Sequence, residues 1–287
     1  MLNKVWLTDK KSEYGATLLL GGFDGLHLGH RQLLACAKKY PYSIGVMTIF
    51  GGKGDCIFTQ EERRLVFKEA GADFVFELPF EEIKSLSPEA FISLLQKEFS
   101  PRAVVCGEDF RFGAQAKGTP TDLKEGGFSN VEVLPLLEKD GKKISSAVIK
   151  GYLENGDIPR ANTLLGERFF LFGEVKKDRQ VGRTLGFPTA NIAYPKEKFS
   201  LKLGVYETRV SVDGAEYKGI TNYGARPTFD NTHVWTETYL DGFSGDLYGR
   251  KLKVEFVRFL RKIERFESVE ELQKQLNTDI RRVRNYD

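Results

Sequence analysis

The pattern of hydrophobic and polar residues divides the chain into two halves of different character. Up to about residue 155, short apolar runs alternate with longer segments of mixed polarity, a pattern typical of strands that alternate with helices. The predicted strands cover residues 16–20, 43–50, 74–78, 103–106 and 131–134. Such alternation favours parallel pairing of the strands, with helices on both faces of the sheet. The first half is therefore predicted to be an α/β unit with a parallel sheet.

The helices expected in this half carry recognisable end signals. Residues 29–39 follow the first strand, and residues 61–70 end at Gly71, a residue type common just beyond a helix. Ser87 and Pro88 are the residue types preferred at an N-cap and in the first turn, so they predict a helix that extends to about residue 99.

After about residue 155 the helical signals fade and short alternating stretches follow. The predicted strands cover residues 169–176, 205–212, 216–221, 234–240 and 252–259. Asp213-Gly214 predicts a two-residue hairpin turn, and Ser268 with Glu271 three residues later predicts the start of a C-terminal helix. The second half is therefore predicted to be an all-β unit that ends in one helix. The linker is expected near residues 154–159, where turn-forming residues cluster.

Composition narrows the class of protein. The 287 residues include 43 Lys+Arg and 40 Asp+Glu, so the formal net charge is +3, too small to indicate nucleic acid or an anionic membrane as the main partner. The longest apolar runs are far shorter than the roughly 20 residues that span a bilayer, and the first residues contain no signal-peptide segment. The three cysteines form no CxxC pair, which argues against a zinc ribbon or a disulfide scaffold. We therefore expect a cytoplasmic protein.

A first candidate site lies at residues 21–30, Gly-Gly-Phe-Asp-Gly-Leu-His-Leu-Gly-His, between the first predicted strand and the first predicted helix. Glycines let the backbone approach a ligand closely, and a helix N-terminus offers free N–H groups and a positive dipole, which suit a phosphate. His27 and His30 can donate hydrogen bonds to phosphate oxygens and so suit a pentacovalent α-phosphorus with a departing pyrophosphate. Two alternatives are a metal-binding pair, for which the sequence shows no third ligand cluster, and ordinary surface histidines.

This segment resembles the HxGH signature of the nucleotidyltransferase superfamily. Residues 144–150, Ile-Ser-Ser-Ala-Val-Ile-Lys, resemble a second motif of that superfamily. Ser145 and Ser146 at a helix start offer hydroxyls and backbone N–H groups to phosphate, and Lys150 could reach the β- and γ-phosphates. Taken alone, the serines would more simply cap a helix.

A second candidate site lies at residues 182–192 in the β half, Gly-Arg-Thr-Leu-Gly-Phe-Pro-Thr-Ala-Asn-Ile. It is not a Walker P-loop, because the Gly-Lys-Ser/Thr ending and the following helix are missing. Thr189 and Asn191 would share one face of a strand. A hydroxyl and an amide oxygen side by side can hold Mg²⁺. The alternative is a Gly/Pro loop that enters a strand with two incidental polar residues.

The second segment is similar to the riboflavin kinase signature, and further stretches follow in that family's order. They are residues 204–206, 222–229, 237–240, 246–249 and 260–261 with Phe266; residues 105–113 also fit the pattern of the first half. Over nearly its whole length the chain resembles the bacterial bifunctional riboflavin kinase/FAD synthetases. The resemblance implies a Rossmann-like nucleotidyltransferase domain at residues 1–156. It also implies a six-stranded antiparallel Greek-key β-barrel of riboflavin kinase type with a C-terminal helix at residues 157–287.

The same resemblance implies two reactions. Riboflavin is phosphorylated by ATP to FMN, and FMN is adenylylated by a second ATP to FAD and pyrophosphate. The expected cofactor is Mg²⁺, and the expected partners are ATP, riboflavin and FMN, with no nucleic acid and no membrane. The expected oligomeric state is a monomer or a weak homo-oligomer.

In the first domain, the resemblance assigns ATP-phosphate binding and transition-state stabilisation to His27 and His30. It gives loop shaping, triphosphate binding and flavin contacts to further residues: Gly21, Phe23 and Gly29 for the loop, Ser145, Ser146 and Lys150 for the triphosphate, and Asp109 and Phe110 for the flavin.

In the second domain, the resemblance makes Glu237 the general base, although without the family pattern this residue would pass for a solvated strand residue between two threonines. A carboxylate suits the task because it need only accept a hydroxyl proton during phosphoryl transfer. The remaining roles are Mg²⁺ and ATP binding by Thr189 and Asn191, loop closure by Gly182 and Gly186, and flavin contacts by Arg261 and Phe266.

Three departures from the family pattern all lie in the first half. Gly22 stands where Asn is frequent, residues 51–55 replace a Pro-His-Pro segment, and Lys150 replaces an Arg, so a planar fork gives way to a point charge. The main alternative is therefore a riboflavin kinase whose first domain is weak or inactive and has a nucleotide-binding, flavin-binding or regulatory role. A flavin-responsive regulatory protein that touches RNA is disfavoured by the near-neutral charge.

Overall fold

The computed structural model describes residues 3–9, 15–52, 54–177, 187–228 and 231–285. The chain forms two compact units, residues 1–148 and residues 149–287. The predicted linker at residues 154–159 lies where one helix ends and another begins. A domain boundary after residue 156 stays a prediction.

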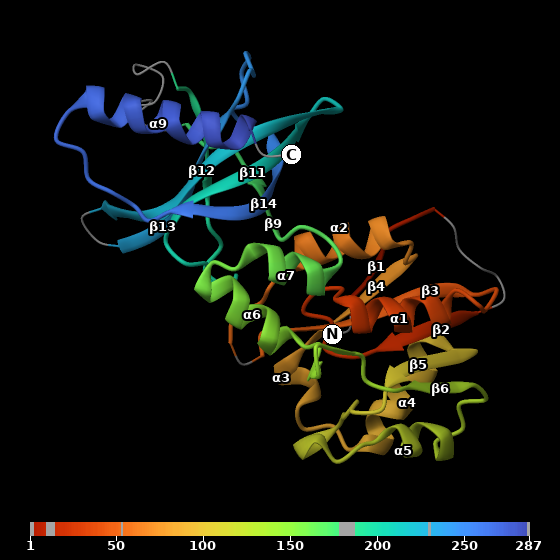
Figure 1. The fold of residues 1–287 in the computed structure, drawn as a ribbon. Coiled ribbons are helices and arrows are strands. Elements are labelled where there is room, and N and C mark those ends of the chain that lie inside the picture. Colours follow the sequence, from red (N-terminus) through yellow and green to blue (C-terminus); the bar gives the residue numbers. More distant parts are fainter. Residues whose placement is uncertain (1–2, 10–14, 53, 178–186, 229–230, 286–287) are drawn as a thin grey trace. The chain divides into compact units, whose positions relative to one another are not determined.

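The first unit is built on a six-stranded sheet, as the alternation of strands and helices predicts (Figure 1). The strand order is β1-β4-β3-β2-β5-β6; β2 to β6 run parallel and β1 pairs antiparallel with β4 at the edge. The strands are β1 (Asn3–Trp6), β2 (Ala16–Leu20), β3 (Ser43–Phe50), β4 (Phe74–Pro79), β5 (Ala103–Gly107) and β6 (Val131–Leu134).

The edge strand β1 is absent from the sequence-based prediction because it has no apolar alternation. Instead, polar groups fix it to the sheet. The amide of Asn3 donates to the Glu77 carboxylate at 3.0 Å, and the Lys4 ammonium lies 4.4 Å from the ring centroid of Phe74. A strand held by polar side chains is not recognisable from hydrophobic period alone.

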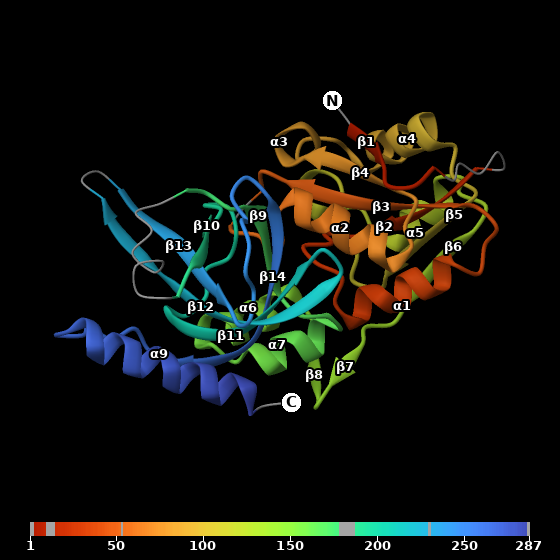
Figure 2. The ribbon, with the colours of Figure 1, turned by 90° about the horizontal axis from the view of Figure 1, so that it is seen from above.

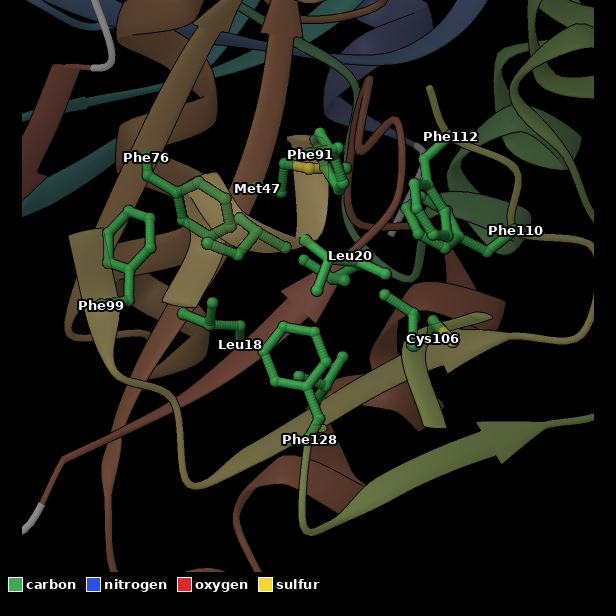
Figure 3. Packing of buried hydrophobic residues seen from close by; sticks show 14 of the residues in the cluster. Leu18, Leu20, Met47, Phe76, Phe91, Phe99, Cys106, Phe110, Phe112 and Phe128 are labelled. Atoms are coloured by element: carbon green, nitrogen blue, oxygen red, sulfur yellow. The ribbon is translucent and has the colours of Figure 1, made fainter. Parts of the chain in front are cut away.

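Helices cover both faces of this sheet. On one face α1 (Leu28–Ala37) contacts β2 and β5, and α2 (Gln60–Ala70) contacts β4. On the other face α4 (Pro88–Phe99) and α5 (Pro120–Glu125) pack into a hydrophobic cluster with alternate residues of the strands (Figure 3). Short elements complete the unit: α3 (Phe80–Ile83), the 3-10 turn η1 (Ala114–Ala116) and the hairpin of β7 (Glu138–Lys139) and β8 (Lys142–Lys143).

The predicted helix ends are confirmed by the capping geometry. Gly71 follows α2 with a φ of 91°, a left-handed conformation that glycine adopts without strain. The Ser87 hydroxyl accepts a hydrogen bond from the Ala90 N–H at 3.2 Å at the start of α4.

The second unit is a six-stranded antiparallel sheet that nearly closes into a barrel, ordered β10-β13-β12-β11-β14-β9 (Figures 1 and 2). A bridge between Lys176 and Asn191 joins the two ends of the sheet. Asp213 and Gly214 form the predicted hairpin turn with φ values of 52° and 84°. The strands are β9 (Phe170–Glu174), β10 (Thr189–Ala193), β11 (Gly204–Val212), β12 (Ala215–Thr228), β13 (Asn231–Leu240) and β14 (Lys251–Arg261).

The C-terminal helix α9 (Val269–Arg284) lies against this sheet. Its Ile280 and Val283 pack with Val205 and Ile220 of the strands. The Lys218 ammonium donates to the carbonyl oxygens of residues 283 and 284, each at 3.2 Å, so a cation meets the negative end of the helix dipole. Ser268 caps α9 as predicted, accepting from the Glu271 N–H at 3.2 Å.

Two further helices precede the barrel strands, α6 (Ser146–Asn155) and α7 (Ile158–Leu165). The second is absent from the sequence-based prediction, because Asp157 and Pro159 indicate a linker as readily as a helix start. In the structure Asp157 is the N-cap of α7 and Pro159 lies in its first turn. Within the described ranges, no helix is long and apolar enough to cross a membrane.

Candidate functional site

A cavity of about 750 Å³ opens in the first unit where β2, β3 and β5 end. Loops after the carboxyl ends of parallel strands are the usual place for a nucleotide in an open α/β sheet. Nine predicted site residues line this cavity together: Gly21, Phe23, His27, Gly29, His30, Asp109, Phe110, Ser145 and Ser146.

The loop before α1 has a constrained backbone. Phe23 has a φ of 34°, which a side chain larger than glycine rarely adopts, and its ring is fully buried. That ring lies 4.3 Å from the His30 ring and meets Phe67 of α2 edge-on at 6.2 Å, measured between centroids. Packing on both sides therefore holds the conformation that the backbone alone disfavours.

The two imidazoles are stacked, with ring centroids 3.6 Å apart and planes 13° from parallel. His30 Nδ1 lies 2.8 Å from the Gly25 carbonyl oxygen, and because a carbonyl only accepts, this nitrogen carries the proton. His27 Nδ1 accepts from the His30 backbone N–H at 3.3 Å, so neutral His27 carries its proton on Nε2. At Nε2, neutral His27 is a donor and neutral His30 is an acceptor, a difference that the shared motif does not reveal.

Both imidazoles are neutral at pH 7. Burial lowers the pKa of His27 from 6.5 to about 4. Burial, reinforced by the neighbouring His27, holds the pKa of His30 well below its ordinary value. A bound polyphosphate would favour the charged forms and raise both pKa values.

Lys143 is a cavity residue that sequence reasoning missed. It belongs to β8, lines the cavity and forms an ion pair with Asp109. Its only signal in the sequence is its place two residues before Ser145. The predicted cation, Lys150, is not among the lining residues, and its ammonium lies 5.7 Å from the ring centroid of Phe199.

The inner part of the cavity is apolar. Phe110 stacks on Phe112 with centroids 5.5 Å apart, and the two rings lie side by side in Figure 3. Met47, Ile49 and Phe91 extend this lining. The cavity thus joins a polar rim near the histidines to an apolar interior, an arrangement that suits a ligand with a phosphate and a flat ring system.

In the second unit, the strand register brings three predicted or motif residues into one row. Glu237 on β13 pairs with Asn191 on β10 and with Asn222 on β12. Residues paired across antiparallel strands point to the same face, so the carboxylate lies between two amides. Asn222 has no role in the sequence-based prediction, because only the register connects it to Glu237.

Thr189 and Asn191 share a face of β10, as their spacing predicts. The Asn191 side-chain N–H donates to the Thr189 carbonyl at 3.4 Å, and Asn191 is 5% exposed. A hydroxyl, an amide oxygen and a carboxylate are the oxygen donors that Mg²⁺ prefers, so the donor set fits this cation. The described residues hold no group of three or more His, Cys, Asp or Glu side chains that could bind a metal, so these few protein oxygens would act together with phosphate and water.

The two remaining flavin candidates lie together. The Arg261 guanidinium is 5.9 Å from the Phe266 ring centroid. It also donates twice to the Asp279 carboxylate of α9, at 3.0 and 2.9 Å. Gly182 and Gly186 lie outside the described residues.

Two family models match the chain, FAD synthetase over residues 9–148 and riboflavin kinase over residues 165–287. The bifunctional riboflavin kinase/FMN adenylyltransferase of Bacillus subtilis is 32% identical over 292 aligned residues, which cover 94% of this chain and 92% of the relative. The protein of the same name from Pseudomonas fluorescens is 33% identical over 284 residues, covering 93% and 91%. A crystal structure described as a macrolide-efflux protein from Streptococcus pneumoniae matches with a TM-score of 0.85 and 28% identity, over 98% of each chain.

Proposed function

The chain belongs to the family of bifunctional riboflavin kinase/FMN adenylyltransferases, and on that premise we propose that it phosphorylates riboflavin with ATP and then adenylylates the FMN with a second ATP to give FAD and pyrophosphate. The observation that carries the proposal for the second reaction is the single cavity lined by nine motif residues in the unit that matches FAD synthetase.

In adenylyl transfer, a phosphate oxygen of FMN attacks the α-phosphorus of ATP and pyrophosphate leaves. His27 would donate from Nε2 to a phosphate oxygen, and the N-terminus of α1 would supply backbone N–H groups. His30, with Nε2 as acceptor, would donate there only after it takes up a proton beside the bound phosphates. Ser145 and Ser146 would bind the triphosphate from the opposite wall, while a phosphate contact by Lys150 stays a prediction.

The flavin ring of FMN would occupy the apolar interior of the cavity. Phe110 is the predicted contact that lies there. Asp109 stands at the rim in an ion pair with Lys143, close to where the FMN phosphate must approach ATP. Gly21, Phe23 and Gly29 would keep the loop close to the phosphates.

In phosphoryl transfer, Glu237 would accept the proton of the ribityl 5′-hydroxyl as that oxygen attacks the γ-phosphorus of ATP, the bond to the β,γ-bridging oxygen breaks and ADP leaves. Thr189 and Asn191 would hold Mg²⁺ and the phosphates. Bound Mg²⁺ would neutralise the charge that develops on the transferred group. The two amides beside Glu237 would orient the carboxylate and the incoming hydroxyl. We assign loop closure to Gly182 and Gly186, and flavin contacts to Arg261 and Phe266.

Two of the three departures in the first half can be placed relative to this cavity. Gly22 lines the cavity, and a Cβ at this position would meet no atom within 4 Å, so the Asn that is frequent in the family pattern would make no packed contact through its Cβ. Lys143 places a cation in the cavity even though Lys150 lies against Phe199.

An end-point assay tests both activities. Purified protein receives ATP and Mg²⁺ with riboflavin in one tube and FMN in another, and the flavins are separated by chromatography. FAD in both tubes is the expected result. FMN from riboflavin with no FAD in either tube would leave a kinase with a silent first unit, and omission of Mg²⁺ tests the metal.

We also propose that the partners are the small molecules ATP, riboflavin and FMN, with no nucleic acid or membrane, and that the protein acts in the cytoplasm as a monomer or weak homo-oligomer. The near-neutral charge and the cysteines Cys36, Cys56 and Cys106, which form no CxxC pair in the sequence, support this proposal. Light scattering during chromatography measures the mass of the particle.

A further inference from the structure

Arg63 on α2 is a buried cation that no motif includes. The residue is only 5% exposed, although charged side chains are rarely buried without partners. Its guanidinium distributes hydrogen bonds over three separate segments. Nε donates to the Phe58 carbonyl at 2.8 Å, Nη1 to the Ile49 carbonyl at 3.0 Å, and Nη2 to the Asp24 carboxylate at 3.2 Å.

Asp24 is the link from Arg63 to the candidate active site. It lies in the loop 21–30, directly after the strained Phe23 and three residues before His27. The oxygen that accepts from Arg63, Oδ1, also accepts from the Ile57 N–H at 2.9 Å, and the Asp24 carbonyl accepts from the Phe58 N–H. The loop is therefore joined to residues 57–58 and, through Arg63, to α2 and the end of β3.

Helix α2 supports the loop at two adjacent points. Arg63 binds Asp24, and one turn later Phe67 packs edge-on against Phe23. The Phe23 ring in turn lies against His30. A displacement of the loop would therefore move the imidazoles, and misplacement of a catalytic group by about 1 Å can cost roughly a hundredfold in rate.

We infer that Arg63 is a positioning residue for adenylyl transfer, which acts through Asp24 to hold the loop that presents His27 and His30. The inference rests on the proposed FMN adenylyltransferase activity. Arg63 lies outside the cavity lining, so it contacts neither ATP nor FMN there, and its effect must pass through the loop.

The neighbouring Arg64 provides a matched control. It belongs to the same helix and forms an ion pair of its own, with nitrogen–oxygen distances of 2.8 and 2.7 Å to Glu77. That pair ties α2 to β4 and has no contact with the loop. Replacing Arg64 removes the same charge and a comparable ion pair without affecting Asp24.

The experiment compares Arg63→Met, Arg63→Lys and Arg64→Met in the full chain. FAD formation from FMN is measured alongside FMN formation from riboflavin, which serves as an internal reference in the other unit. We expect Arg63→Met to lower kcat for FAD formation roughly 10- to 100-fold, and Arg63→Lys to lower it less, because an ammonium keeps the charge but not the three-way fork. Arg64→Met leaves the buried Glu77 without its guanidinium, but it should keep kcat for FAD formation within about twofold, since that pair joins α2 to β4 and does not involve Asp24.

A second readout distinguishes positioning from general destabilisation. The chain has three histidines, so their ring protons give few NMR signals, and His233 in the second unit is a reference. In folded Arg63→Met, water should reach the loosened loop, and the pKa of His27 should rise from about 4 toward 6.5. In Arg64→Met the pKa of His27 should remain near 4. If Arg63→Met does not fold, kcat for FAD formation and the His27 titration are measured on Arg63→Lys, and these two results decide whether Arg63 positions the loop.

Two results would overturn the inference: a folded Arg63 variant whose FAD formation matches that of Arg64→Met, or histidine titrations that Arg63 substitutions leave unchanged. The double variant Asp24→Ala/Arg63→Met should cost less than the sum of the two single changes, because the two side chains share one contact; fully additive losses would also count against the inference. A wild-type chain that makes FMN but no FAD would instead refute the proposed adenylyltransferase activity, while the titrations would still decide whether Arg63 holds the loop.

Discussion

Replacing Asp279 by Ala tests whether Arg261 supports the second unit or serves the flavin. The Asp279 carboxylate is fully buried and accepts two hydrogen bonds from Arg261 through Oδ2. Its other oxygen accepts from the Gln275 amide at 2.9 Å. Because the Arg261 side chain is only 12% exposed, the substitution leaves a nearly buried guanidinium with only the Glu264 carboxylate, at 3.9 Å. Breaking a buried pair in this way costs about 3–5 kcal/mol of unfolding free energy.

An exposed ion pair of similar geometry gives the comparison. Arg284 and Asp241 also join α9 to the sheet, with two nitrogen–oxygen distances of 2.7 Å, but the Arg284 side chain is 60% exposed. Solvent screens such a pair, and its contribution is about 0–1 kcal/mol. Asp241→Ala is therefore the matched control for Asp279→Ala.

The chain allows the second unit to be measured separately. It has two tryptophans, Trp6 in the first unit and Trp235 in the second. In a Trp6→Phe background, fluorescence during urea unfolding reports only on the second unit. We expect Asp279→Ala to lower the unfolding free energy by about 3–5 kcal/mol and Asp241→Ala by at most about 1 kcal/mol. If Asp279→Ala changes the free energy by no more than its control, while the KM for riboflavin rises, the reasoning fails and Arg261 serves the flavin.

Three further predictions follow from the two sites. Glu237→Gln should lower FMN formation roughly 10²–10⁴-fold and leave FAD formation from FMN unchanged, because the base is lost in only one unit; parallel loss of both activities in a folded variant would contradict this. His27→Ala with His30→Ala should show the reverse pattern, with FAD formation down at least about 10²-fold in the same paired assay. The first unit should also lose stability in acid. Unfolded His27 binds its proton near pH 6.5 and native His27 near pH 4, so the unfolded state binds more protons between these values. The unfolding free energy is therefore highest above about pH 6.5, falls as the pH drops toward 4, and is lower by about 2 kcal/mol at pH 5. Urea unfolding followed by Trp6 in a Trp235→Phe background measures this loss, and an equal unfolding free energy at pH 7 and pH 5 would refute it.

Local signals in the sequence predicted those parts of the fold that depend on local chemistry. The buried strands of the first sheet, the Gly71 helix end, the Ser87 cap and the Asp213-Gly214 turn each involve a few adjacent residues, whose preferences are the same in any protein. The strand β1 depends on partners far along the chain, and the start signals of α7, Asp157 and Pro159, are equally those of a linker. Asn3 finds Glu77 across 74 positions, and no pattern within residues 3–6 records that contact.

The candidate site residues also divide into those predicted from short local motifs and those that only the three-dimensional structure reveals. Nine of them were predicted because they belong to three short segments, residues 21–30, 105–113 and 144–150, and the fold of the first unit brings all three segments to one cavity. Lys143 and Arg63 were missed, since each acts on a motif from another segment. The sequence also could not predict the different tautomers of His27 and His30. They are determined by hydrogen bonds to the His30 backbone N–H and the Gly25 carbonyl, not by the identity of the residues.

Glu237 shows how the structure separates one glutamate from the others in the barrel. Glu207 is fully buried, and its two carboxylate oxygens accept from Arg209 and Arg258, each at 2.7 Å. A fully buried carboxylate whose two oxygens both accept from guanidiniums is a structural tie, and its burial leaves no access for a substrate hydroxyl. Glu237 is half-buried and lies in register with two amides, Asn191 and Asn222, which can orient a carboxylate without adding positive charge beside it. The register of three strands thus supplies the physical reason for choosing Glu237 as the base, which the sequence could offer only through the family resemblance.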